Sequence, residues 1–267
     1  MPAMRPCRGA DAVSAVLAIS LVTVLEAARG RFAWLIAGFV SVGCVLAVFA
    51  GEVAITGTQG FRSGLLGAWL RWCAVFTVSA FAVSSAAGDA RDKGLDLMLS
   101  TSMPRWVYCA GKLAGFAAVA VVSATACALA VAWFAPLPHT ALWGASLAVE
   151  LLIVAATSLL CALAFTHVAW AMSTVLGFYV LSRSMAALQL ISHAPGAEPG
   201  SVAWSFIRAF LDALAYLLPD LDRFTESQWL IHGTGTLADL GFAATQAAVY
   251  TALLGAAVLF DLHRRAL

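Results

Sequence analysis

The chain has 267 residues, of which 62% are hydrophobic and only 11% are charged. Ordinary globular domains are roughly 45–50% apolar and roughly 25% charged, so the composition excludes a compact water-soluble protein and indicates an integral membrane protein. Fifteen basic and fourteen acidic residues give a net charge of +1. Because this charge is nearly neutral, a nucleic-acid partner is not expected.

Six stretches are long and apolar enough to cross a bilayer core, which needs about 20 residues of helix. One of them, Trp72–Gly88, reaches this length only if it extends back through residues 65–70 and Arg71 snorkels to the interface. Pro136–His139 divides a long apolar region into two further spans. The predicted spans are Phe32–Gly51, 65–88, 113–135, Leu142–Phe165, Ala169–Ile191 and Leu240–Phe260. We therefore expect an all-α integral membrane protein with six transmembrane helices, in a single domain over residues 1–267.

The segment before the first span is shorter. Ala12–Leu25 holds 14 uncharged residues, which favours an interfacial helix over residues 11–28. A signal peptide is the alternative, although Glu26–Arg29 is a poor cleavage site. Ten of the fifteen Lys and Arg residues fall on one side of the six spans, which predicts that both termini and the 89–107 loop are cytoplasmic.

Few residues suggest catalysis or metal binding. A P-loop needs GxxxxGK[ST], but Gly111-Lys112 is followed by Leu113 and Trp106 occupies the first Gly position. The five histidines and six cysteines form no ligand motif, so no metal and no cofactor are expected in this chain. Asp220 and Asp222 near His232 are the one cluster that a lipid-modifying membrane enzyme could use, and this enzyme is one alternative function.

The segment 89–105 has the pattern of a helix lying under the membrane. One face carries charged and polar residues at helical spacing, and the other carries Leu and Met. The polar face holds Asp89, Asp92, Lys93, Asp96 and Ser100, and the apolar face holds Leu95, Met98, Leu99 and Ser102. A solvated connecting loop is the alternative, but it does not explain the Leu/Met register.

The residues from Asp92 to Lys112 resemble the cytoplasmic loop of type-2 ABC transporter permeases. The shared elements are Lys93-Gly94, the Leu-rich turn 95–101, Arg105-Trp106 and Gly111-Lys112. Two departures are a Leu in place of the usual Thr after the Gly, and Pro104 two positions later than the family's Pro. The end of this helix is therefore expected to differ in shape from that of the family.

The resemblance implies a permease subunit of an ATP-driven exporter in a bacterial inner membrane, paired with a second, identical or related permease subunit. Two copies of a separate ATPase subunit would bind ATP and Mg²⁺ and dock on residues 89–105, which would act as a coupling helix. The residues implied in this docking are Asp89, Asp92, Lys93, Gly94, Asp96, Met98, Leu99 and Arg105. The run 218–224 resembles the branch of the family associated with multicopper-enzyme maturation.

The external segment 192–235 contains an amphipathic helix that begins near Ser201 and stops at Pro219. Trp204 and Phe210 lie on its apolar face, and Arg208 and Asp212 form an i,i+4 pair on the other. These four residues are predicted to form an external gate, and a simple membrane-surface cap is the alternative.

Two charged residues lie inside the predicted spans. Glu150 and Arg183 have the same expected depth, which favours an ion pair between neighbouring helices, with a cargo or gating contact as the alternative. A stand-alone secondary transporter or channel would usually carry more intramembrane charges than these two, and it remains an alternative function.

Overall fold

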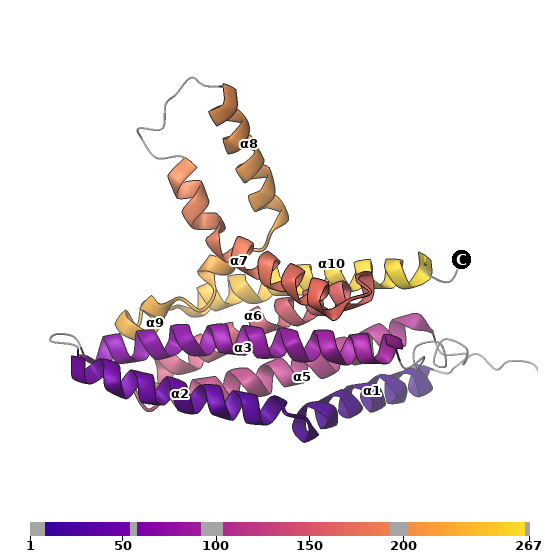
Figure 1. The fold of residues 1–267 in the computed structure, drawn as a ribbon, viewed down its shortest axis with the longest axis horizontal. Helices are drawn as coiled ribbons and strands as arrows, with labels where there is room; N and C mark the ends of the chain where they lie inside the picture. The colour runs from indigo at the N-terminus through magenta and orange to yellow at the C-terminus, as the bar shows by residue number, and fades with distance from the viewer. Residues whose placement is uncertain (1–8, 54–57, 92–103, 193–201, 265–267) are drawn as a thin grey trace, which may run out of the picture.

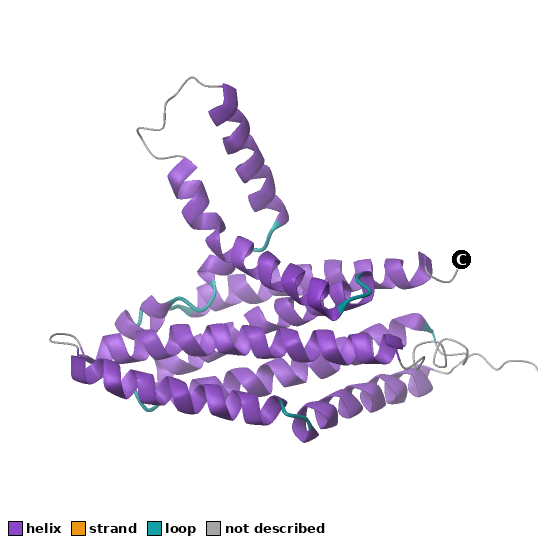
Figure 2. Ribbon diagram, in the orientation of Figure 1, coloured by secondary structure: helices purple, strands orange, loops and turns teal. Residues whose placement is uncertain are grey.

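The computed structural model describes residues 9–53, 58–91, 104–192 and 202–264, and all regular elements in these ranges are helices (Figures 1 and 2). The long helices are α1 (Gly9–Arg29), α2 (Phe32–Val53), α3 (Thr58–Arg91), α5 (Arg105–Val131), α6 (Leu137–Ala164), α7 (Val168–Ser192) and α10 (Leu237–Arg264). The shorter ones are α8 (Val202–Leu217), the 3₁₀ helix η1 (Leu221–Arg223) and α9 (Ser227–His232). The all-α class expected from the sequence is confirmed.

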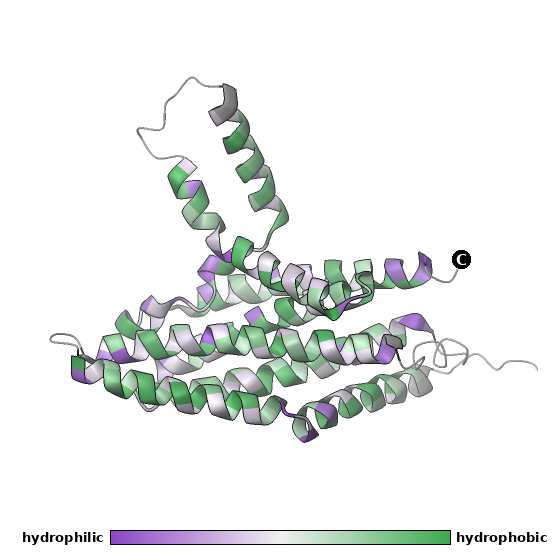
Figure 3. Cartoon of the chain, viewed as in Figure 1, coloured by the Kyte–Doolittle hydropathy of each residue, from purple (hydrophilic) through white to green (hydrophobic). Residues whose placement is uncertain are grey.

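Among the described residues, seven helices are long and apolar enough to cross a membrane, one more than the sequence analysis expects. The additional one is α1, which is 21 residues long because its last turns continue through Glu26 and Arg29. Figure 3 shows long hydrophobic stretches along these helices, with hydrophilic residues gathered mainly towards their ends. This pattern fits a multi-pass membrane protein.

The helices form an inner and an outer group. In α3, α5 and α6, between 50% and 72% of the apolar stretch of the helix is buried, whereas in the other four long helices at most 22% of it is buried. The three inner helices supply most of the core, including Leu70, Phe116 and Leu151. The outer helices therefore expose apolar side chains that lipid would cover in the membrane.

Close packing of α1 on α5 depends on two glycines. A Cβ atom at Gly111 would lie 2.8 Å from the Cβ of Ile19, and one at Gly115 would lie 2.7 Å from the Cβ of Thr23. Such small residues let helix backbones approach closely where lipid gives no hydrophobic drive for association. The register also shows that α1 and α5 run parallel, because Ile19 meets Gly111 and Thr23 meets Gly115.

Helices α1 and α2 follow each other in the same direction along α3 and lie end to end in Figure 1. The contacts fall in steady order: Gly51 approaches Arg62, the Trp69 indole donates to the Phe39 carbonyl, and the ring of Phe32 packs 5.1 Å from that of Phe81. Glu26, in α1, continues the series by accepting a hydrogen bond from Ser85. Both helices are thus antiparallel to α3.

The end of α7 and the whole of α8 project away from the bundle as a hairpin (Figure 1). α8 ends at Leu217, two residues before Pro219. Its exposed side chains include Phe206, Phe210 and Tyr216, so the apolar surface extends beyond the single face expected from the sequence. An exposed surface of this kind suits lipid or a second protein chain.

Candidate functional site: two buried polar clusters

One polar cluster lies inside the bundle around Glu150, a residue of α6 that is fully buried. The Tyr179 hydroxyl donates a 2.8 Å hydrogen bond to Glu150 Oε1, and Arg183 Nη1 lies 3.5 Å from the same oxygen. The hydroxyl of Thr225 donates to the other carboxylate oxygen. Arg71 of α3 completes this group, which we call the Glu150 cluster and define as Arg71, Glu150, Tyr179, Arg183 and Thr225.

The cluster fastens the chain segment that follows α8. Arg183 Nη1 donates to the carbonyls of Leu221 (2.6 Å) and Phe224 (2.8 Å), and Arg71 Nη1 donates to that of Thr225 (3.0 Å). Leu221, Phe224 and Thr225 are all fully buried. The two arginines therefore act as caps for backbone carbonyls that would otherwise be buried without donors.

Thr225 is held in an unusual backbone conformation. Its φ angle is 45°, in the left-handed region that a β-branched residue rarely adopts. Its amide donates a 3.1 Å hydrogen bond to Ser146 Oγ, so side chains from α3 and α6 fix its backbone on both sides. Such strain persists only where the surroundings over-determine the conformation.

The sequence analysis located part of this cluster. It placed Glu150 and Arg183 at one depth, and the structure brings them within ion-pair distance. The expectation that Arg71 snorkels to the interface is wrong, because Arg71 is only 8% exposed and bonds inside the bundle. Tyr179 and Thr225 had no sequence signal, since neither forms a motif and Thr225 reaches the cluster only through the folding of its loop.

A second cluster joins the end of α3 to the start of α5. We call it the Lys112 cluster and define it as Glu26, Ser85, Asp89, Tyr108 and Lys112. Lys112 is 4% exposed, and its Nζ lies 2.9 Å from Asp89 Oδ2 and 2.8 Å from Ser85 Oγ. Asp89 also accepts a 2.9 Å hydrogen bond from the Tyr108 hydroxyl. Glu26 of α1 accepts from Ser85 at 2.7 Å and lies 3.9 Å from Lys112, so three helices meet here.

The contacts of Asp89 in the structure differ from those expected from the sequence. The sequence analysis placed Asp89 on the cytoplasmic acidic face of the coupling helix, whereas the structure directs its carboxylate to Lys112 and Tyr108. Arg105, at the start of α5, donates a 2.7 Å hydrogen bond to the Leu262 carbonyl of α10. The other predicted docking residues, Asp92, Lys93, Gly94, Asp96, Met98 and Leu99, lie outside the described residues.

The four predicted gate residues all belong to α8. Arg208 Nε donates a 2.7 Å hydrogen bond to the Ser192 carbonyl at the end of α7, which ties the two arms of the hairpin together. Phe210 is exposed, and Trp204 and Asp212 are half-buried. Trp204 and Asp212 also have interaction partners, so neither is free.

The part of the chain that the structure describes contains no group of three metal-ligating side chains, and its five cysteines are free. Asp220, Asp222 and His232 accordingly do not gather into a metal-binding cluster; Asp220 instead lies 3.1 Å from Arg223. Comparison with known proteins found no matching family model and no match among curated proteins. The geometry of the two clusters and the resemblance of the 92–112 segment are therefore the features that bear on function.

Proposed function

We propose that the chain is the membrane-spanning permease subunit of a type-2 ABC transporter, an exporter in which a separate ATPase subunit supplies the energy. The observation that carries the proposal is the Lys112 cluster. It clamps α3 to α5 through Asp89, just before the 92–112 segment that resembles the coupling loop of that family, and through Tyr108 and Lys112 near the end of that segment. A force applied to this segment would reach both helices together.

Six crossings and a non-crossing α1 are part of the proposal. α1 and α2 point in the same direction along α3, and two consecutive helices of one direction cannot both cross the same bilayer. α2 has 22 residues, about 33 Å of helix, which matches a bilayer core of about 30 Å. α1 would then be the interfacial helix, and both termini would lie in the cytoplasm.

Helix α3 supplies the mechanical link between the two clusters. It is continuous from Thr58 to Arg91 and carries both Arg71 and Asp89, which are 18 residues or about 27 Å apart. A packed helix transmits displacement as a rigid element. Movement at the ATPase side would thus reach the Glu150 cluster near the other end of the bundle.

The Glu150 cluster would convert this movement into a change at the α7–α8 hairpin. It binds α3, α6 and α7 to the loop that leads out of α8. A shift of α3 relative to α7 would move the arginine donors that bind the carbonyls of that loop. The loop would have to move with these donors, because a buried carbonyl without a hydrogen bond is costly. The hairpin, with Trp204, Arg208, Phe210 and Asp212, would thereby open or close the exit from a path formed between two permease subunits.

The experiment is co-purification with candidate ABC ATPase subunits from the same genome, followed by ATPase assays in proteoliposomes. We expect a complex with two ATPase and two permease subunits and ATP hydrolysis that depends on the permease. Asp92→Lys with Asp96→Lys should abolish the association, while Asp261→Lys on α10 serves as the control for charge reversal elsewhere. The proposal fails if no complex forms with the wild-type chain, or if the double variant binds and stimulates the ATPase as the wild type does.

A further inference from the structure

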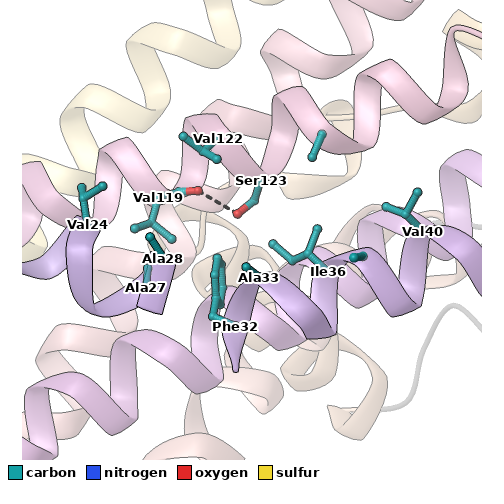
Figure 4. Close-up of a pocket in the computed structure, with 12 residues that line it drawn as sticks. Val24, Ala27, Ala28, Phe32, Ala33, Ile36, Val40, Val119, Val122 and Ser123 are labelled. Atoms are coloured by element: carbon teal, nitrogen blue, oxygen red, sulfur yellow. Dashed lines mark hydrogen bonds between the residues drawn. The ribbon is translucent and has the colours of Figure 1, made fainter. Parts of the chain in front are cut away.

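A lipid-facing groove lies where α1, α2 and α5 meet (Figure 4). Its cavity volume is about 450 Å³, within the range of small-molecule sites in proteins. Figure 4 shows Phe32 and Ile36 of α2 facing Val119, Val122 and Ser123 of α5 across it. The only hydroxyl among these, on Ser123, donates to the Val119 carbonyl of its own helix, so the lining offers an apolar surface.

The shape of the groove follows from the break between α1 and α2. The two helices pack on different partners, α1 on α5 and α2 on α3, and they separate at Gly30. Ala27, Ala33 and Ala37 line the groove with side chains too small to fill it. The lining runs from Phe32 to Val40 along α2, about 12 Å of helix, and from Val119 to Ala126 along α5, about 10 Å, so the groove extends along both helices.

Two cations lie beside the groove, between its α1 lining and its α2 lining. Arg29 and Arg31 occupy the junction of α1 and α2, next in sequence to the lining residues Ala28 and Phe32, and both are exposed. The carboxylate nearest in sequence, on Glu26, already accepts a hydrogen bond from Ser85 and lies 3.9 Å from Lys112. The junction beside the groove therefore carries an excess of positive charge.

The junction also lies at a membrane boundary. α2 spans about 33 Å, and the charges at its two ends, Arg31 and the ion pair of Glu52 with Arg62 (3.2 Å), mark the two surfaces of an apolar layer. Lipid phosphates lie at this depth, and basic pockets beside transmembrane helices bind anionic headgroups. An acyl chain attached to such a headgroup would enter the groove directly.

We propose that this groove binds one anionic glycerophospholipid, with the phosphate at Arg29 and Arg31 and one acyl chain between α2 and α5. The bound lipid would fill the space under the α1–α2 junction and hold α1 beside the Lys112 cluster, to which α1 contributes Glu26. The lipid would lie in the cytoplasmic leaflet, a placement that rests on the topology proposed above, whereas the site itself does not depend on the proposed transport function.

The test is native mass spectrometry of the purified full chain titrated with phosphatidylglycerol and with phosphatidylcholine of identical acyl chains. Arg29→Gln with Arg31→Gln should lower the affinity for phosphatidylglycerol by roughly thirtyfold, as expected for two surface cations, and leave that for phosphatidylcholine unchanged. Arg264→Gln, which removes an exposed cation at the end of α10, is the matched control.

A second variant tests the groove itself. Ala37→Phe places a ring among the lining residues and should weaken the binding of both lipids, whereas Val45→Phe adds bulk to a lipid-facing position of α2 outside the groove and should not. The proposal is overturned if the wild type binds both lipids equally, if the arginine double variant behaves like Arg264→Gln, or if Ala37→Phe behaves like Val45→Phe.

Discussion

At the scale of single residues, the two buried clusters differ in their balance of charge. The Glu150 cluster contains two guanidinium groups and one carboxylate, and the Nε of Arg71 is buried without an acceptor among the described residues. The excess positive charge is met by backbone carbonyls of residues 221–225 rather than by a second acid. Removal of Glu150 would therefore leave both cations without a carboxylate in direct contact.

This balance predicts the outcome of a charge swap. Glu150→Arg and Arg183→Glu should each lower the free energy of unfolding by about 3–5 kcal/mol, the usual cost of breaking a buried ion pair. The double variant should not recover the lost free energy of unfolding, because a glutamate at position 183 cannot donate to the Leu221 and Phe224 carbonyls. Unfolding in mixed detergent micelles, followed by circular dichroism, measures the three values. Full recovery would show that the pair acts alone and that the carbonyl contacts contribute little.

The Lys112 cluster predicts a contrast between buried and exposed ion pairs. Lys112→Met should destabilise the protein by about 1–3 kcal/mol, because the Lys112 side chain is 6% exposed and its loss leaves Asp89, whose side chain is 35% exposed, without its cation. Arg62→Met breaks the pair with Glu52, whose side chains are 30% and 76% exposed, and should cost at most about 1 kcal/mol. Thermal unfolding of both variants in the same detergent checks the ranking. Equal effects would mean that the Lys112 cluster is solvated.

At the scale of elements, the sequence predicted most of the helices because apolar length alone selects them. Its helix over residues 11–28 lies close to the bounds of α1, but the count of uncharged residues understated the apolar length, because the helix continues through Glu26, which contacts Ser85 and Lys112. The sequence also could not give the direction of α1 relative to α2. That direction depends on the packing of Ile19 and Thr23 against two glycines about 90 residues later, which no local pattern encodes.

The contact between α1 and α5 can be tested at Gly111. Gly111→Ala places a methyl group 2.8 Å from the Ile19 Cβ and should cost about 1–3 kcal/mol through overpacking. Ile19→Ala in the same chain keeps the Cβ of residue 19 but removes the two γ-branches that would crowd the new methyl group at position 111. The double variant should therefore recover part of the lost stability. Gly38→Ala, where a Cβ meets nothing within 4 Å, is the control and should be neutral or slightly stabilising. A double-mutant cycle with no coupling between positions 19 and 111 would contradict the observed register.

The sequence likewise predicted part of the candidate site and missed the rest. Glu150 and Arg183 were found because charges inside apolar spans are few and costly, so their depths could be compared. Arg71 was misplaced because a long side chain near the end of a predicted span can either snorkel outwards or bond inwards, and only the position of the Thr225 carbonyl decides between these. Loop 218–225 supplies that carbonyl through a tertiary contact.

At the scale of the whole molecule, the arrangement places two polar clusters along one bundle of apolar helices. The inner helices α3, α5 and α6 hold them in register, and the outer helices present apolar surface to the surroundings. Because α3 belongs to both clusters, neither can move without a change at the other or a break in a helix that is 34 residues long. The fold is thus suited to transmit a displacement along its length.

The direction of α1 and α2 leads to a last prediction, about topology. If only α2 crosses the membrane, the six crossings leave both termini on one side, whereas seven would place them on opposite sides. An epitope tag at either end should therefore be protected from protease in intact spheroplasts and cleaved in inside-out vesicles. A tag inserted after Val53, between α2 and α3, should show the reverse pattern and controls for access. An N-terminal tag cleaved in spheroplasts while the C-terminal tag is protected would show that α1 crosses the bilayer, and the interfacial role proposed for it would fail.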